Sequence, residues 1–370
     1  MTVKSVKLDQ FRNYESLELQ FDPGTNLFYG DNAQGKTNAL EAVYLCGTTR
    51  SHRGNRDREM IRFGHEEAHV RMELLKNDIS YRIDMHLKKS RSKGIAVNGV
   101  PVRKASDLIG IGNFIFFSPE DLNIIKNGPA ERRRFLDMEL CQLSAVYLSE
   151  LASYNRALAQ RNQLLKDIAS GKEDRLLLDV LDEQLVHFGL RIMKMRREFS
   201  AELSEIVREI HRKLSGDREK LVLTYERSVE PEAFSQQLFM NRERDLRTGT
   251  TNCGPHRDDL CFSIEEADIR RYGSQGQQRT AALSLKLSEI ELVRKRIHDT
   301  PILLLDDVLS ELDENRQKYL LESIHDIQTM ISCTGVDHFV RNHFRIDRLF
   351  YVKEGHVTEE HTEKSSEAGM

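Results

Sequence analysis

The sequence lacks any long apolar run. No stretch of its 370 residues approaches the roughly 18 consecutive apolar residues that a membrane-spanning helix requires. It has only five cysteines, an odd number without a CxxC pair, which argues against a disulfide framework and favours reduced thiols. The first ten residues, MTVKSVKLDQ, contain no apolar signal core. We therefore expect a cytoplasmic protein.

Proline and glycine are also sparse, at 7 and 21 residues. Together with 39% hydrophobic and 31% charged residues, this excludes collagen-like, mucin-like and wholly disordered proteins. The formal net charge of -4 does not attract polyanions, so any nucleic-acid contact must come from local basic clusters. The composition predicts a helix-rich globular protein of two or three domains.

The apolar pattern divides the chain into segments of different structure. Alternating apolar residues along 68–74 and 79–87 predict two antiparallel strands, and Asn98-Gly99 predicts a hairpin turn because both residues tolerate positive φ. Between 128 and 214 the apolar spacing becomes three and four, interrupted by a polar segment at 170–174. This predicts two long helices folded back as an antiparallel hairpin, with two ordinary core helices as the alternative.

The strongest local motif is a glycine-rich loop that fits GxxxxGK[ST]. It follows an apolar strand at 26–29 and precedes a helical segment at 38–46, which is the context of a phosphate-binding P-loop. In such a loop the backbone N–H groups and the lysine bind phosphates, and the threonine hydroxyl is offered to Mg²⁺. The predicted ATP-binding residues of the loop are Gly30, Asp31, Asn32, Ala33, Gln34, Gly35, Lys36 and Thr37.

A second motif supplies carboxylates for the metal. The run Ile302 to Leu305 is too short and abrupt for a helix and is typical of a buried parallel strand. It ends in Asp306, expected to hold Mg²⁺, and Asp307, expected to position or deprotonate the attacking water. Alone, these carboxylates could begin a turn; beside a P-loop we interpret them, with Lys36, as catalytic.

The separation of the two motifs is informative. Lys36 and Asp306 lie 270 positions apart (306 − 36), so a large insert separates the halves of one ATPase sheet. A helical hairpin that interrupts a split head is the layout of the SMC and Rad50-like branch of the ABC ATPases, which this chain resembles. Ser310 to Asp313 resembles the D-loop of that branch, with Ser310 and Asp313 as its site residues. The segment before the helix 279–297 resembles the ABC signature, with residues Ser274, Gln275, Gly276, Gln277 and Gln278.

Three further segments narrow the resemblance to the RecF family of bacterial recombination mediators. They are FRNY at 11–14, FSPEDL at 117–122 and GPHRDD at 254–259, and the resemblance runs from Val3 to about Glu354. It implies an α/β fold, in which an ABC-type P-loop ATPase head with an antiparallel β layer is split by an inserted helical-hairpin arm. The expected domains are 1–118 and 251–358 for the head, 119–250 for the arm, and a disordered tail at 359–370.

The same resemblance implies a mechanism. ATP and Mg²⁺ are the expected cofactors, and Arg12 and Asn13 join the expected ATP-binding residues. Ser274 would contact the γ-phosphate bound by a second subunit and take part in catalysis there, so that ATP induces a two-fold homodimer. From its surroundings alone, Ser274 would be a plain helix cap. The implied activity is a weak ATPase, and the implied role is ATP-dependent DNA binding in DNA repair, replication-fork maintenance and the SOS response, with RecR and RecO as partners.

Two departures from the family pattern limit these expectations. Most ABC ATPases have Glu where Asp307 stands, and the shorter side chain predicts slow hydrolysis. The switch-histidine position reads Thr334, with His338 four residues later, and no Gln follows the strand at 114–117, so we assign neither the γ-phosphate sensor nor the Q-loop.

Basic clusters at 50–62, 88–93 and 191–197 are candidates for DNA contact, although charge runs are usually solvated faces. In the Rad50-like branch, dimerisation brings two such patches into one groove. No aromatic interleaving or recognition helix accompanies these clusters, so we expect contacts to phosphate without sequence reading. The predicted DNA-binding residues are Arg50, Arg53, Arg56, Lys88, Lys89 and Arg91.

Three other interpretations agree less well with the sequence. Cys253, His256, Asp258, Asp259 and Cys261 are metal-capable, but their irregular spacing argues against a zinc site. The ATPase subunit of a membrane transporter shares the P-loop and signature but should lack the helical hairpin. A phosphotransfer enzyme for a small metabolite disagrees with the order of the motifs.

Overall fold

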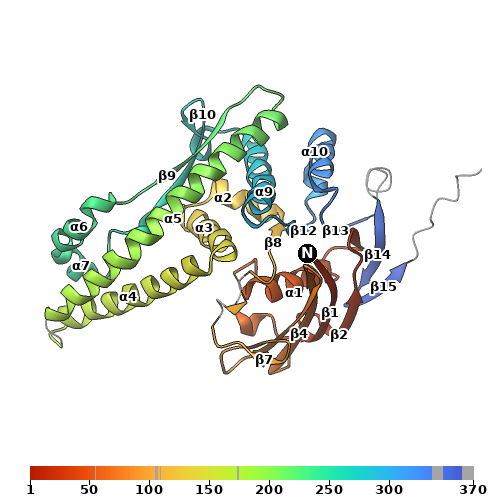
Figure 1. Cartoon of the computed structure of the whole chain (residues 1–370), viewed down its shortest axis with the longest axis horizontal. Coiled ribbons are helices and arrows are strands. Elements are labelled where there is room, and N and C mark those ends of the chain that lie inside the picture. The colour runs from red at the N-terminus through yellow and green to blue at the C-terminus, as the bar shows by residue number, and fades with distance from the viewer. Residues whose placement is uncertain (55, 105–106, 109, 173–174, 336–344, 361–370) are drawn as a thin grey trace, which may run out of the picture. The chain divides into compact units, whose positions relative to one another are not determined.

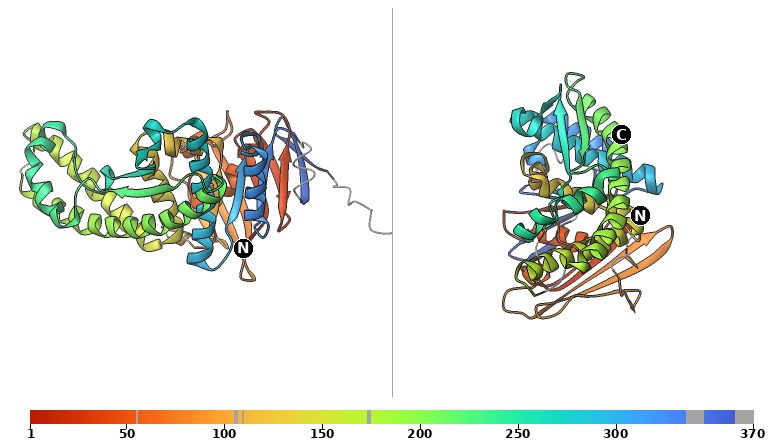
Figure 2. Two further views of the ribbon diagram at one scale, coloured as in Figure 1. Left: turned by 90° about the horizontal axis from the view of Figure 1, so that it is seen from above. Right: turned by 90° about the vertical axis from the view of Figure 1, so that its left-hand side faces the viewer.

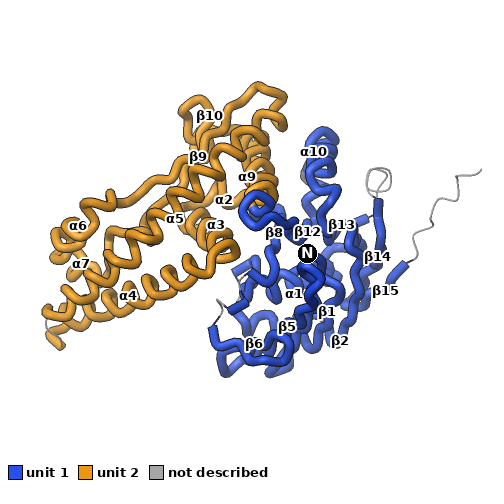
Figure 3. Tube along the Cα trace, in the orientation of Figure 1, with its two compact units in different colours: residues 1–121, 293–370 blue, residues 122–292 orange. Residues whose placement is uncertain are grey.

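A computed structural model of the chain describes residues 1–360 except 55, 105–106, 109, 173–174 and 336–344 (Figure 1). The chain divides into two compact units, coloured separately in Figure 3. Unit 1 comprises residues 1–121 and 293–370, and unit 2 comprises residues 122–292. Within the described part of the chain, no helix is both long and apolar enough to cross a membrane.

Unit 1 contains a six-stranded sheet in the order β15-β14-β3-β13-β12-β8. All its strands are parallel except β15, which pairs antiparallel with β14. Every residue of β12 is buried, so the predicted buried parallel strand at 302–305 is confirmed. The strands are β3 (Thr25–Tyr29), β8 (Phe114–Phe117), β12 (Ile302–Asp306), β13 (Thr329–Cys333), β14 (Ile346–Lys353) and β15 (His356–Glu360).

The chain end differs from the predicted disordered tail at 359–370. Glu359 and Glu360 belong to β15, because they pair with Phe350 and Leu349 of β14. Residues 361–370 lie outside the described part of the chain.

The second sheet of unit 1 is antiparallel, in the order β2-β1-β4-β5-β6-β7. The predicted pairing of 68–74 with 79–87 is confirmed, and so is the hairpin, with positive φ at Asn98 (52°) and Gly99 (80°). The strands are β1 (Thr2–Phe11), β2 (Tyr14–Gln20), β4 (Glu67–Lys76), β5 (Ile79–Lys88), β6 (Gly94–Val97) and β7 (Val100–Pro101).

Helix α1 (Lys36–Thr48) is enclosed between the two sheets of unit 1. It contacts β1, β4 and β5 of the antiparallel sheet and β8, β12 and β13 of the parallel sheet. Eleven of its 13 residues are buried, which is why its sequence is apolar on nearly every side. This packing holds the first turn of α1, where the P-loop ends, in place. Unit 1 also contains the helix α10 (Glu314–Ile324).

Unit 2 is built on two helices that lie side by side in Figures 1 and 2, α4 (Ala145–Ala169) and α5 (Leu176–Leu214). The first predicted long helix is wrong in one respect, because it breaks at Ser144 between α3 (Pro129–Leu143) and α4. Ser144 is extended, and its hydroxyl accepts a hydrogen bond from the backbone N–H of Tyr147, so it caps α4.

The remaining elements of unit 2 surround these helices. β9 (Leu221–Glu226) pairs with β10 (Asp259–Ile264), and β10 with β11 (Ala267–Asp268). Through this pairing, β10 and β11 belong to unit 2 together with β9. The domain boundaries predicted from the sequence stay predictions. α9 (Gln275–Ile297) runs across the boundary between the units. The short helices are α2 (Leu122–Lys126), α6 (Phe234–Met240), α7 (Arg242–Thr248) and α8 (Ile269–Tyr272).

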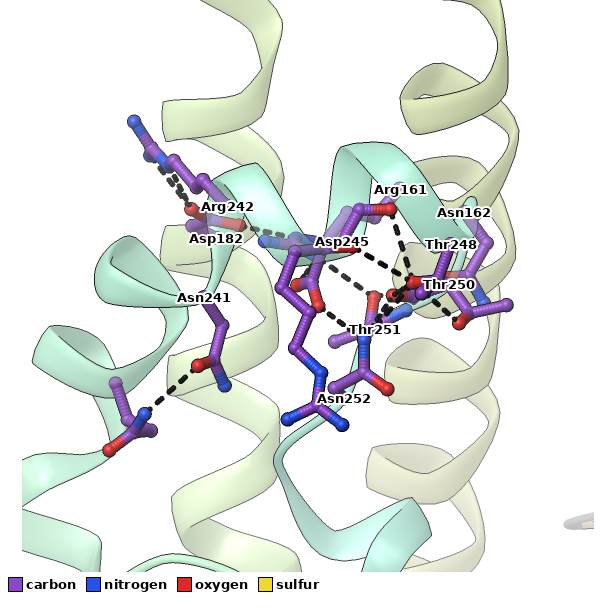
Figure 4. Close-up of polar contacts among 12 residues, drawn as sticks. Arg161, Asn162, Asp182, Asn241, Arg242, Asp245, Thr248, Thr250, Thr251 and Asn252 are labelled. Atoms are coloured by element: carbon purple, nitrogen blue, oxygen red, sulfur yellow. Dashed lines mark hydrogen bonds and ion pairs between the residues drawn. The ribbon is translucent and has the colours of Figure 1, made fainter. Parts of the chain in front are cut away.

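A buried ionic network joins α4, α5 and α7 (Figure 4). The guanidinium of Arg161 is fully buried and donates to Asp182 at 2.5 Å, to Asp245 at 2.7 Å and to the hydroxyl of Thr251 at 2.9 Å. Asp245 also accepts a hydrogen bond from the amide of Asn252 at 2.7 Å. Because the charges lie away from water, loss of one partner leaves another uncompensated.

We predict that Asp245→Ala lowers the free energy of unfolding by about 3–5 kcal/mol, as measured by urea denaturation. The control is Glu243→Ala in the same helix, whose side chain pairs with Arg175 in solvent and should contribute little. Equal, small losses for both variants would contradict a stabilising role for the buried network.

Candidate nucleotide-binding site

The P-loop lies where the sequence predicts it, between β3 and α1. Gly30 and Gly35 have φ values of 144° and 122°, which L side chains rarely adopt. A Cβ atom at Gly30 would lie 2.3 Å from the carbonyl oxygen of Val352, and one at Gly35 would lie 2.6 Å from Nδ2 of Asn13. Both glycines are therefore required by the conformation of the loop and by its close neighbours.

The turn between β1 and β2 supports the loop. Asn13 Nδ2 donates to the carbonyl oxygen of Gln34 at 2.8 Å, and Asn13 Oδ1 accepts from Asn38 Nδ2 at 2.8 Å. The hydroxyl of Tyr14 donates to the carbonyl oxygen of Gly35 at 3.0 Å, and burial raises the pKa of this tyrosine. Asn13 thus lies at the P-loop, where it holds the backbone; its contact with ATP stays a prediction.

The turn between β14 and β15 supports the loop from another direction. The backbone N–H of Gly355 donates to the carbonyl oxygen of Gln34 at 3.1 Å, and that of Glu354 donates to Gln34 Oε1 at 2.6 Å. Sequence reasoning missed this support, because the pairing of β14 with β3 brings the turn to the loop.

Arg12 is held against α1. Its Nε and Nη2 donate to the two carboxylate oxygens of Glu41 at 2.8 and 2.9 Å, and its Nη1 donates to the carbonyl oxygen of Glu59 at 2.8 Å. Glu41 is fully buried and also accepts a hydrogen bond from Ser51. The Arg12 guanidinium therefore binds groups of its own chain here. Its contact with ATP stays a prediction.

Lys36 lies folded over its own loop. Its ammonium donates to the carbonyl oxygens of Gly30 at 2.6 Å and Asp31 at 2.7 Å. Burial lowers the pKa of Lys36, although the charges of Asp307 and Asp306 act to raise it. A phosphate group would supply the nearby negative charge that favours the ammonium form.

The two sequence-distant motifs meet at Thr37. Its hydroxyl donates to Asp306 Oδ1 at 2.7 Å, joining α1 to the end of β12. The same carboxylate oxygen accepts from the hydroxyl of Ser332 on β13, at 2.6 Å. β13 lies between β3 and β12, so the carboxyl ends of three parallel strands converge here. Ser332 was missed from the sequence, where its signal is a small polar residue at the end of an otherwise apolar strand.

Asp307 leaves the strand in an unusual conformation. Its φ is 53°, and its backbone N–H donates to the carbonyl and hydroxyl oxygens of Ser332, both at 3.1 Å. The predicted D-loop, Ser310 to Asp313, follows, and the hydroxyl of Ser310 donates to the carbonyl oxygen of Asp307 at 2.9 Å. Asp313 caps α10 by accepting from the backbone N–H of Arg316 at 3.0 Å. These roles of Ser310 and Asp313 are local to the chain.

The predicted signature segment begins α9 in unit 2. Ser274 Oγ accepts from the backbone N–H of Gln277 at 3.2 Å, and Gln277 Oε1 accepts from the backbone N–H of Ser274 at 2.9 Å, which forms a capping box. Ser274, Gln275 and Gly276 are exposed, whereas Gln278 is buried and donates to the carbonyl oxygen of Ile269 at 2.9 Å. Ser274 is a helix cap within the chain; its contact in trans stays a prediction.

Two family positions stay unassigned. Thr334 is exposed just after β13, and His338 lies outside the described residues. After β8, the backbone N–H of Ser118 donates to Asp121 at 2.7 Å, and no Gln occurs between 114 and 121.

His256 and Asp258 of the GPHRDD segment form hydrogen bonds inside unit 2. His256 Nε2 faces the carbonyl oxygen of Thr251 at 3.0 Å, so this nitrogen carries the proton, and Nδ1 accepts from the hydroxyl of Tyr154 at 2.7 Å. Burial lowers the pKa of His256 to about 4. Asp258 accepts hydrogen bonds from the Tyr225 hydroxyl and the backbone N–H of Ser228. Both side chains are therefore engaged in holding unit 2 together.

The basic residues differ in how their charge is compensated. Arg50, Arg53 and Arg56 are exposed, as is Arg91. Lys88 and Lys89 lie 3.7 and 3.2 Å from the carboxylates of Glu67 and Glu66.

The third predicted cluster is wrong at Arg196. Its guanidinium is buried and donates to the Tyr147 hydroxyl at 2.9 Å, the Pro255 carbonyl at 2.6 Å and Asp137 at 2.7 Å. The helical period of α5 turns this arginine toward the core, whereas Arg191, Lys194 and Arg197 are exposed.

Residues 2–358 match the family described as the RecF/RecN/SMC N terminal domain. The chain is 60% identical over 357 residues to the DNA replication and repair protein RecF of Agathobacter rectalis, covering 96% of this chain and 99% of that protein. It is 44% identical to the protein of the same name from Halalkalibacterium halodurans, covering 96% and 98%. These relatives give no support to the transporter interpretation.

Comparison with solved structures points to the same family. A structure described as the recombination mediator protein RecF-ATP in the RecFOR pathway is 36% identical, with a TM-score of 0.91 over 97% of both chains. An Smc head bound to the C-winged helix domain of ScpA has a TM-score of 0.57 at 17% identity over 98% of both chains, a likeness of fold alone. The expected α/β ABC-type ATPase head fold is confirmed, and the chain belongs to the RecF family of DNA replication and repair proteins.

Proposed function

We propose that this chain binds ATP with Mg²⁺ at the P-loop of unit 1 and uses ATP binding to control its association with DNA during repair and replication. The observation that carries the proposal is the 2.7 Å hydrogen bond between Thr37 and Asp306, which joins a P-loop hydroxyl to a strand-end carboxylate. The ATP-bound state of a RecF structure that is 36% identical supports it.

The donor set fits a hard cation. Thr37 and Asp306 offer a hydroxyl and a carboxylate oxygen, and Mg²⁺ prefers oxygen ligands and usually keeps several waters. Bound Mg²⁺ would offset negative charge on the phosphates. Lys36 would exchange its two carbonyl partners for phosphate oxygens, and the N-terminus of α1 would add favourable partial charge.

The signature segment would make the contact with a second subunit. Ser274 is exposed at the N-terminus of a 23-residue helix, where backbone N–H groups and the hydroxyl favour an anion. We place it against the γ-phosphate bound by a second copy, so that two ATP molecules lie between two identical faces. ATP binding would then determine whether the protein is dimeric.

Asp307 would position or deprotonate the attacking water. Its carboxylate is one methylene shorter than the Glu of most ABC ATPases, so hydrolysis should be slow and the ATP-bound dimer long-lived. The exposed arginines of both subunits would contact the DNA phosphates, without recognition of the base sequence. We further propose that the protein acts in the cytoplasm with RecR and RecO, supports replication forks and the SOS response, and releases DNA after hydrolysis.

Lys36→Met should abolish ATP binding, because the phosphates lose their buried cation. Isothermal titration calorimetry with ATP and Mg²⁺ measures this directly. Lys318→Met, which alters an exposed lysine on α10, is the control and should bind normally. Unchanged ATP affinity in the Lys36 variant would defeat the proposed site.

Ser274→Arg should leave ATP binding intact but abolish the ATP-induced dimer, as measured by sedimentation velocity. Ser274→Asp separates the two roles of this residue, because Asp also caps a helix but would repel the γ-phosphate. We expect it to retain thermal stability and lose the dimer. An ATP-induced dimer in both variants would rule out the contact in trans.

Asp307→Asn should slow ATP hydrolysis by about 100-fold or more, the usual contribution of a general base, and prolong the dimer. Phosphate release in a single turnover measures the rate. Asp326→Asn, at an exposed aspartate beside His325, is the control. Turnover as fast as in the unmodified protein would contradict the role of Asp307.

A further inference from the structure

The outer face of the antiparallel sheet carries a cluster of metal-binding side chains. Along β4, Ala68 and Val70 are buried on the side that includes the contacts with α1, whereas Glu67 and His69 alternate to the exposed side. His86 of β5 is in register with His69 across the strand pair, so both imidazoles project from the same face.

The three side chains already converge. The rings of His69 and His86 stack with their centroids 3.9 Å apart and their planes at 25°. The carboxylate of Glu67 contacts Nε2 of His86. One ligand atom from each of the three residues can be chosen so that all lie within 4.8 Å of one another.

We propose that Glu67, His69 and His86 form a binding site for a divalent transition metal, with Zn²⁺ as the reference ion. Two imidazoles and one carboxylate form a ligand set found in open zinc sites, where water occupies the fourth position. Bonds of about 2.0–2.2 Å in a tetrahedral site place ligand atoms roughly 3.3–3.5 Å apart. Side-chain rotations that unstack the two imidazoles and bring the ligand atoms closer than their present 4.8 Å limit would close the site, while the strand pair stays in register.

The site is reachable from solvent. His69 and His86 border a hollow of about 480 Å³, whose lining also includes Asp9, Arg71 and Asp84. Gly94 of β6 is in register with His86 and has no side chain, so it leaves space beside that imidazole. An ion and its water can thus approach without displacing the fold.

Local charge both favours and opposes the ion. The carboxylate of Asp9, in register with His69, adds negative charge. Against this, the ammonium of Lys88 lies 3.7 Å from Glu67 and competes for its carboxylate. Removing Lys88 should therefore strengthen metal binding.

The test uses the full-length protein with Zn²⁺ and Co²⁺ alone. Zn²⁺ affinity is measured by competition with a chromophoric chelator, and visible Co²⁺ absorption reports the ligands. We expect His69→Asn and His86→Asn each to weaken binding by about tenfold or more, a loss typical even of residues that only support a ligand. Glu67→Gln should also weaken Zn²⁺ binding, and Zn²⁺ should raise the thermal midpoint of the unmodified protein by more than that of these three ligand variants.

Two controls make the result decisive. His356→Asn removes an exposed histidine from β15 and should leave affinity unchanged, whereas Lys88→Ala should increase it. Circular dichroism verifies that each exposed substitution preserves the fold. Equal affinity in all variants, or a Co²⁺ spectrum with sulfur charge-transfer bands that marks a cysteine site, would overturn the proposal.

Discussion

The hydrogen bond between Thr37 and Asp306 is the interaction on which the candidate site depends. It joins residues 269 positions apart, at the first turn of α1 and at the end of β12. The strand order brings them together, because β13 lies between the P-loop strand and β12 and supplies Ser332 to the same carboxylate. The parallel sheet therefore aligns a hydroxyl, two carboxylates and a buried lysine at one edge.

Packing and hydrogen bonds around α1 hold these side chains in position. The helix is enclosed by two sheets, and the loop before it is held by hydrogen bonds from Asn13 and Tyr14 on one side and from the β14–β15 turn on another. The buried carboxylate of Glu41 is compensated by Arg12, which fastens the β1–β2 turn to the same helix. Phosphate would then meet N–H groups that need little rearrangement, which reduces the cost of binding.

The sequence predicted what depends on local pattern and missed what depends on strand order. The P-loop, the buried strand before Asp306 and the Asn98-Gly99 hairpin each rest on a few adjacent residues with distinct backbone or burial requirements. Ser332 and the Glu354-Gly355 turn reach the site only through strand pairing with distant segments, which no local pattern reveals. The helix break at Ser144 was missed because the helical spacing of apolar residues continues on both sides of it. A single capping serine can end one helix and begin the next without changing that spacing.

The most direct test of the Mg²⁺–ATP site is a double-mutant cycle on Thr37→Val and Asp306→Asn, with ATP affinity measured by calorimetry with and without Mg²⁺. If these two side chains hold one ion, each single variant loses the Mg²⁺-dependent part of the affinity, and the double variant loses little more. Full Mg²⁺ dependence in either single variant, or independent and additive losses, would contradict the account.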